Sequence, residues 1–436
     1  MKLLHLVAIP LILTSVLTFG NTPQTLKIAK IDFEGLNRLS VAEVTAIIDL
    51  KVGDTFSIVA LDTAAQTLID SGMFRNVAYR TKAIKSQINI IFTVEESSVR
   101  SSQVIFDNFI WFSDAELLTA VRRDVPTFNG SAPDNGDIAE RVAKSLERLL
   151  HEQKIEATVS HMTSQDSLGS TSQEEVFTVN GVPMPICSIR FPGSNNVSEA
   201  KLIESAKPLL NSEYSKKFVS LFATNNLIPL YRERGQLKAE FSPPSGRPEA
   251  TSTCKSGVEL TLPVAEGPIY KWTKANWLGN RTLTQQELDA ALAMRTGEIA
   301  NGVQFDIGIK NAEKAYGRNG FLLARVRATA DFNDAAETVG YKLEVTEGPL
   351  FHMSRFAVKG FPETLAGKIK ERWRLTPGEV YDDGYWREFA DKQLPELMHN
   401  TLMDRRNQGK PAPNLKWDSI VNRESHTVDV VLELTN

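Results

Sequence analysis

The stretch GLNRLSVAEVTAIIDLKVGD, residues 35–54, decides the fold, because its layout returns twice further along the chain. It opens with one glycine and closes with a second glycine followed by an acid. The same spacing of 18 residues that separates Gly35 from Gly53 also separates Gly279 from Gly297 and Gly360 from Gly378. A fixed spacing that recurs is typical of a chain built from repeated structural units.

The first copy can be interpreted element by element. Residues 26–35 alternate apolar and polar side chains, which predicts a strand that Gly35 ends. Ser40 and Glu43 have the spacing of a capping box, which predicts the start of a helix, and Gly53 is expected to cap its end. A second helix and two strands are predicted over 60–72, 74–83 and 87–96. The unit is therefore strand, helix, helix, strand, strand.

The same template accounts for the rest of the chain. Capping boxes recur at Ser113 with Glu116 and at Thr284 with Glu287. Asn211, a residue that tolerates a left-handed backbone, stands where the third copy should have its second glycine. The second copy lacks both glycines and is placed by its order of elements. The predicted fold is α+β, an array of about five βααββ modules, with modules 1 to 5 over 25–97, 98–183, 184–267, 268–348 and 349–436.

The N-terminus has the layout of a secretory signal peptide. One lysine precedes an apolar run over residues 3–17, and small residues follow, so cleavage is expected near Gly20 and residues 1–20 are assigned to the signal. The alternative is an uncleaved membrane anchor, but the run is shorter than the roughly 20 residues that span a bilayer. We therefore expect an exported protein.

Export bears on the two cysteines. Cys187 and Cys254 could pair in an oxidising compartment, or they could be two unrelated buried thiols. The sequence leaves both alternatives open, because pairing depends on a distance that spacing along the chain does not give.

Composition and motifs argue against several classes of function. The 49 basic and 53 acidic residues give a net charge of −4, without the basic face that nucleic-acid binding requires. The six histidines are scattered, and no nucleophile elbow or phosphate loop occurs, so we expect no enzyme, no metal and no cofactor. Asp382 and Asp383 could belong to a metal or sugar site, but acids at the start of a helix are the more ordinary interpretation.

The repeated unit resembles the POTRA domain, and five in tandem behind a signal peptide resemble the periplasmic region of the outer-membrane assembly factor BamA. The residues that carry this resemblance are Gly35, Gly53, Asp54, Gly72 and Phe74 in module 1 and Gly279, Asn280, Gly297, Glu298, Gly320, Phe321 and Glu347 in module 4. That family usually continues into a membrane β-barrel. Since this sequence stops at Asn436, the resemblance implies either a free-standing array or a truncated assembly factor.

The resemblance implies a binding function located at the edge of a sheet. In such modules the second strand is the outer one, and an extended chain can add to it through backbone hydrogen bonds. Carried over, these strands are 75–82, 236–241 and 322–328. The preferred candidate is the strand Gln236, Leu237, Lys238, Ala239, Glu240 and Phe241. The expected partners are unfolded outer-membrane proteins or a membrane barrel, in the periplasm and associated with the outer membrane. The alternative is a structural hub that links envelope proteins without binding clients.

Overall fold

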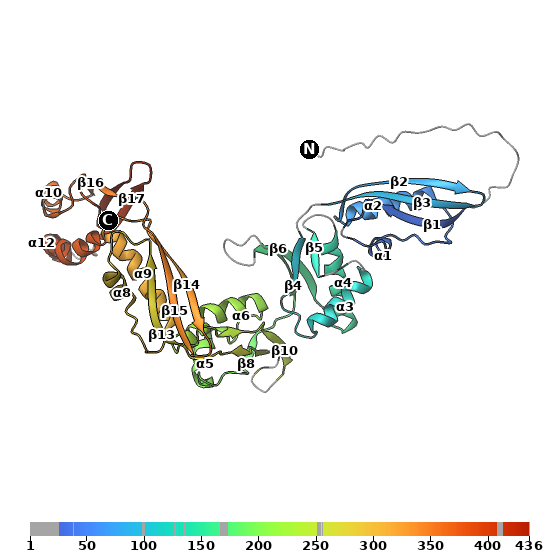
Figure 1. Ribbon diagram of the computed structural model, residues 1–436, viewed down its shortest axis with the longest axis horizontal. Helices are drawn as coiled ribbons and strands as arrows, with labels where there is room; N and C mark the ends of the chain where they lie inside the picture. The colour runs from blue at the N-terminus through green and yellow to red at the C-terminus, as the bar shows by residue number, and fades with distance from the viewer. Residues whose placement is uncertain are drawn as a thin grey trace. The chain divides into compact units, whose positions relative to one another are not determined.

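The computed structural model describes residues 26–435 except 38, 98–100, 126–127, 129, 134–136, 166–172, 251–253, 255 and 408–412. The predicted signal peptide therefore lies outside the described residues. The chain divides into two compact units, one made of the part up to Met184 together with Gly246–Gly257, the other of Pro185–Ser245 and Val258–Asn436 (Figure 1). Among the described helices, none combines the length and the apolar character needed to cross a membrane.

Module 1 has the predicted order of elements. Its sheet has the order β1-β3-β2, with β1 parallel and β2 antiparallel to the central strand. Val44, Leu61 and Leu68 from the two helices are buried against Ile90 and Phe92 of the sheet. Its elements are β1 (Lys27–Glu34), α1 (Val41–Thr45), α2 (Ile58–Asp70), β2 (Phe74–Ile84) and β3 (Gln87–Glu96).

Module 2 keeps this plan and adds a short strand. Its sheet has the order β5-β4-β7-β6, so the extra strand β5 lies on the outer side of β4. This strand is only three residues long and was not predicted from the sequence. The elements are β4 (Ser101–Phe106), α3 (Asp114–Asp124), β5 (Ser131–Pro133), α4 (Ile138–Glu152), β6 (Thr158–Gln165) and β7 (Gln173–Asn180).

Module 3 departs most from the template. Its sheet has the order β10-β11-β8, and a separate two-stranded ribbon joins β12 to β9. Its second helix widens into a π turn just before Pro229, because proline lacks an amide and its ring clashes with the preceding turn. The elements are β8 (Ile186–Arg190), α5 (Glu199–Ala206), η1 (Lys207–Leu209), α6 (Lys216–Phe222), η2 (Ala223–Leu227), α7 (Ile228–Arg232), β9 (Glu240–Phe241), β10 (Ser245–Glu249), β11 (Gly257–Thr261) and β12 (Val264–Ala265).

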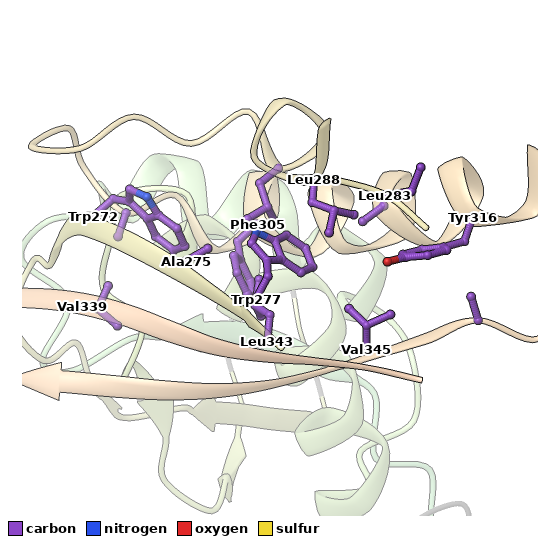
Figure 2. Close-up of a cluster of buried hydrophobic side chains, with 14 of the residues drawn as sticks. Trp272, Ala275, Trp277, Leu283, Leu288, Phe305, Tyr316, Val339, Leu343 and Val345 are labelled. Atoms are coloured by element: carbon purple, nitrogen blue, oxygen red, sulfur yellow. The ribbon is translucent and has the colours of Figure 1, made fainter. Parts of the chain in front are cut away.

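Module 4 repeats module 1 closely. Its sheet has the order β13-β15-β14, again parallel on one side of the central strand and antiparallel on the other. Trp272, Trp277, Phe305 and Leu343 meet in the core between sheet and helices, as Figure 2 shows. The elements are β13 (Lys271–Leu278), α8 (Gln285–Leu292), α9 (Gly302–Arg318), β14 (Arg325–Asn333) and β15 (Thr338–Thr346).

Module 5 has the sheet order β16-β18-β17. The second helix that the template predicts is interrupted by a π turn before Pro395, for the same reason as in module 3. Trp373, Trp386 and Trp417 lie in an aromatic cluster with Phe356 and Phe389, which assigns these tryptophans to packing. The elements are β16 (His352–Lys359), α10 (Glu363–Arg372), α11 (Tyr385–Glu388), η3 (Phe389–Gln393), α12 (Leu394–Asn407), β17 (Asn414–Asn422) and β18 (Thr427–Thr435). The predicted α+β array of βααββ modules is confirmed.

Candidate functional site

The first glycine, in the four modules that have it, is required by a close backbone contact. Gly35, Gly193, Gly279 and Gly360 all have positive φ, between 73° and 93°. A Cβ atom at these four positions would lie only 2.1 to 2.4 Å from a carbonyl oxygen of the strand beside it. Two conditions, a left-handed backbone and no room for a side chain, therefore select glycine at the end of the first strand.

The second glycine has a different role from the predicted one. It was expected to cap the first helix, but α8 ends at Leu292 with Ala293 as its left-handed cap, well before Gly297. The amide of Gly297 instead donates to the carbonyl of Trp272, and the amide of Trp272 donates to the carbonyl of Glu298. This pair of hydrogen bonds ties the turn after the first helix to the first strand. The C-cap prediction is therefore wrong, and the glycine belongs to a turn.

The same tie occurs in three other modules. The amides of Gly53, Asn211 and Gly378 donate to first-strand carbonyls over 2.8, 2.9 and 2.8 Å. All three residues have positive φ, and a Cβ atom at Gly53 or Gly378 would meet no atom within 4 Å. Because only the left-handed backbone matters there, asparagine can replace glycine at position 211.

A glutamate at or just after the end of the last strand fixes the loop after the first glycine; Glu266 is buried, and Glu347 and Glu96 are half-buried. In module 4, Glu347 Oε1 accepts hydrogen bonds from the amides of Arg281 and Thr282, both at 2.8 Å. Burial raises the pKa of Glu347, but these amides lower it by more, so the net pKa lies below its usual value. In module 3, Glu266 accepts from the amides of Asn195 and Asn196 and has a lowered pKa for the same reasons. In module 1, Glu96 holds the corresponding loop.

The preferred candidate strand, Gln236–Phe241, is not an open edge. Only Glu240 and Phe241 form a strand, and they pair with β12. Gln236 is fully buried, and Leu237 packs against the core of module 4. The prediction of a six-residue edge strand is therefore wrong, because the neighbouring module covers the first part of this segment.

Lys238 makes direct contacts with side chains of module 4. Its Nζ donates to the Asp334 carboxylate over 2.7 and 2.9 Å and lies 4.6 Å from the ring centre of Phe332. Asp334 also accepts from the Tyr270 hydroxyl at 2.7 Å. Lys238 thus belongs to a contact between modules, and the Ala239 amide donates to the carbonyl of Gln236 in a turn, so neither residue is part of an open edge strand.

The outer strand of the module 3 sheet is β10, which carries Pro248. A proline in an edge strand removes one of the amides that an added strand would use. This edge is consequently less suited to receive another chain than the edges that keep all their amides.

Cys187 and Cys254, near β8 and β11, are both disulfide-bonded, and the chain contains no other cysteine.

Two joints between consecutive modules are built alike. The carbonyl of Gly235 accepts from the amide of Tyr270, and that of Gly320 accepts from the amide of Phe351, both at 2.9 Å. A Cβ atom on Gly235 would lie 2.8 Å from Ile299, which follows the second glycine of the next module.

An arginine from the end of the second helix then reaches an acid of the next module. Arg232 pairs with Asp306 in two hydrogen bonds, and Arg318 pairs with Glu388 and Asp382. Asp382 also accepts from the amide of Gly384, as expected for an acid at the start of a helix.

In the described part of the chain, no group of acids, histidines or cysteines is arranged to hold a metal.

Four modules keep a long outer strand on the side of the second strand. These are β2, β6, β14 and β17, each hydrogen-bonded to one neighbour among the described strands. The range predicted for module 4, 322–328, overlaps β14 only in part, because 322–324 form a turn before the strand begins at Arg325.

Comparison with known families agrees with this geometry. The model of the POTRA family, described as a surface antigen variable number repeat, matches residues 26–97 and 270–348. These two segments are POTRA domains. They coincide with modules 1 and 4, which have both glycines, the turn tied to the first strand and the glutamate that holds the loop after the first glycine.

Curated relatives are similar over much of the chain. An outer membrane protein assembly factor of Treponema pallidum is 23% identical over 93% of this chain and 47% of its own length. BamA of Neisseria meningitidis is 20% identical over 56% of this chain and 31% of its own length. The chain thus spans about half the length, or less, of these relatives. Among solved structures, the POTRA3-5 fragment of Haemophilus influenzae BamA is 20% identical, with a TM-score of 0.39 over 58% of this chain and 96% of that fragment.

Proposed function

We propose that this protein acts in outer-membrane protein assembly, in the periplasm, where its POTRA modules hold extended polypeptides. The relatives named as outer membrane protein assembly factors support the process. The observation that carries the binding mode is the open edge of β14 in module 4. An extended chain adds to such an edge through backbone groups, so one edge can serve many sequences.

The hydrogen-bond pattern of β14 defines which groups are available. The amide of Val326 turns away from β15 and donates to the Glu313 carboxylate at 3.1 Å. In an antiparallel ladder, residues alternate between facing the partner strand and facing away from it. The amides and carbonyls of Ala328, Ala330 and Phe332 therefore face outward together with Val326. The Val326 amide is already engaged by Glu313, whereas those of Ala328, Ala330 and Phe332 have no partner in the described part of the chain and form a row along the edge.

A photoreactive residue at position 328 tests this proposal in living cells. Ala328 is exposed on the outer strand, and a matched residue at the exposed Gln286 on α8 serves as the control. Cross-links to several outer-membrane precursors at 328, and none at 286, would support the proposal. One folded envelope protein as the sole adduct would instead indicate a hub.

Proline at position 328 gives a second, independent test. Ala328→Pro removes one outward amide, while the bonds to β15 come from the neighbouring residues, so the sheet should remain intact. Ala328→Val keeps the amide and controls for the change in side chain. We expect the proline variant alone to lose its adducts, with both variants folded by circular dichroism. Unchanged cross-linking in the folded proline variant would contradict edge binding.

A further inference from the structure

Resting on the proposed function, we infer that the β14 edge selects extended chains by the order of their charges. It favours a segment with a basic residue followed four positions later by an acidic one, running antiparallel to β14. The occupant is a two-faced strand of an unfolded polypeptide, polar on one face and apolar on the other. The charges of β14 that remain unpaired carry this inference.

Arg327 and Asp331 lie on the solvent face of the β14 strand. Both are exposed, with Thr329 between them, and side chains two apart share one face of a strand. In the described part of the chain, neither residue forms an ion pair with another side chain. They stand four residues apart, about 13 Å along the strand. Arg325, also exposed, lies two residues before Arg327 on the same face. The edge is therefore positive at its N-terminal end, at Arg325 and Arg327, and negative at Asp331, in a fixed order.

Among the described residues, the neighbouring strand forms no ion pair with either charge. The pKa of Glu344 is lowered mainly by its hydrogen bond with Lys342 and also by the nearby Arg327, so Arg327 is attracted to this strand without being paired with it. Asp331 lies opposite Gly340, which has no side chain. Arg327 lies opposite Glu344, but the Glu344 carboxylate is hydrogen-bonded to Lys342 at 2.5 Å. On β15, Gly340 has no side chain and the Glu344 carboxylate is already paired with Lys342. A partner strand on the open side of β14 can therefore interact with both Arg327 and Asp331.

Other edges differ in this respect. On β2, Arg80 pairs with Glu34 at 2.6 Å, and Arg75 pairs with Glu95. On β17, Lys416 and Asp418 pair with each other at 2.9 Å. Lys82 of β2 is in no described ion pair, but β2 contains no acid, and β17 has only its one paired base and acid. Neither strand therefore presents a base and an acid that are both available to an incoming chain.

The geometry of an added strand would bring the charges close together. Because Ala328 and Ala330 face outward with their backbone groups, residues opposite Arg327 and Asp331 would occupy non-hydrogen-bonded pairs. Side chains approach most closely in such pairs. An antiparallel chain would run from Asp331 toward Arg327. The residue opposite Asp331 would therefore come first and should be basic, and the residue opposite Arg327 would come four positions later and should be acidic.

The opposite face of β14 accepts apolar side chains. Ala328 is exposed, and Val326, Ala330 and Phe332 are half-buried against the core of module 4. Two alanines leave apolar surface that larger side chains of an added strand could cover. An occupant with apolar residues at alternate positions fits this face, and that alternation is typical of transmembrane β-strands.

Three synthetic peptides distinguish charge selection from simple edge binding. They share one alternating apolar pattern and differ at two polar positions, carrying lysine then glutamate, glutamate then lysine, or glutamine at both. Binding to the full chain is measured by fluorescence anisotropy at low salt. The lysine-first peptide would form two favourable cross-strand pairs, whereas the glutamate-first peptide would place like charges opposite each other twice. The glutamate-first peptide should therefore bind about tenfold more weakly, and the glutamine peptide should have an intermediate affinity. The preference should shrink at high salt.

A charge-swapped protein provides the matched control. Arg327→Glu combined with Asp331→Arg should reverse the preference, while Lys416→Asp combined with Asp418→Lys on β17 should leave it unchanged. Equal binding of the three peptides would overturn charge selection and leave edge binding standing. Tighter binding of the glutamate-first peptide would overturn the antiparallel order. Binding of no peptide would overturn both proposals. If the swapped variant fails to fold, the three peptides on the natural chain still decide the question.

Discussion

Replacing each of the two glycines of module 4 by alanine should have very different costs. Gly279 and Gly297 have almost the same backbone, with φ of 82° and 85°. A Cβ atom at 279 would lie 2.4 Å from the carbonyl oxygen of Val345, whereas a Cβ atom at 297 would meet nothing within 4 Å. The pair therefore separates the cost of a left-handed backbone from the cost of a steric clash.

The magnitudes follow from these two terms. A left-handed alanine costs roughly 1–2 kcal/mol, which both variants bear. Gly279→Ala must in addition displace a strand in the middle of the sheet, and overpacking of this kind costs roughly 1–3 kcal/mol more. We therefore expect Gly297→Ala to lose about 1–2 kcal/mol and Gly279→Ala about 2–5 kcal/mol of the free energy of unfolding of module 4.

Hydrogen exchange of the whole chain, followed by mass spectrometry over 338–346, measures the opening of this sheet. Gly297→Asn is a useful third variant, since Asn211 occupies the equivalent position with φ of 65°. It should be the mildest of the three. Equal losses for the two alanine variants, within about 0.5 kcal/mol, would refute the view that a carbonyl contact selects Gly279.

Three further predictions test other features. Glu347→Gln should destabilise module 4 by about 0.5–1.5 kcal/mol at neutral pH, because the amides of Arg281 and Thr282 lose a charged acceptor, whereas Glu344→Gln, which removes only a surface ion pair with Lys342, should cost less. Since its folded pKa is lowered from 4.5, the contribution of Glu347 should be full above pH 4.5 and disappear as the pH falls through the lowered value, which acid unfolding of the Gln variant would check. Glu313→Gln should speed hydrogen exchange at the Val326 amide and leave the rest of β14 unchanged, because only that amide loses its carboxylate. Serine in place of both cysteines should lower the stability of module 3 by about 4 kcal/mol in urea unfolding, and a negligible loss would contradict this estimate.

Local signals predicted most of the fold. The capping boxes at Ser40, Ser113 and Thr284 form as expected, because each needs only residues three positions apart. The alternating strands and the repeated glycines also identified the modules. The second glycine was placed in the right position with the wrong role, since its partner lies on a strand more than twenty residues away.

The candidate edge could not be located from the sequence. Gln236–Ala239 alternates like a strand, but its burial depends on side chains of the next module, such as Asp334, about a hundred residues later. The true outer strand of that sheet, β10, contains a glycine and Pro248, which sequence patterns count against a strand. Contacts between modules, and not local propensity, decided where the edge lies.

The π turn of module 3 has a consequence for how these repeats can change length. From Asn211 to Gly235 the chain advances 24 residues, and from Gly297 to Gly320 it advances 23. One extra residue in a regular helix would rotate everything after it by about 100°. Yet Gly235 and Gly320 present the same carbonyl to the following module. The widened turn takes up the additional residue locally, so an insertion or deletion inside the second helix can be inherited without disturbing the modules that follow.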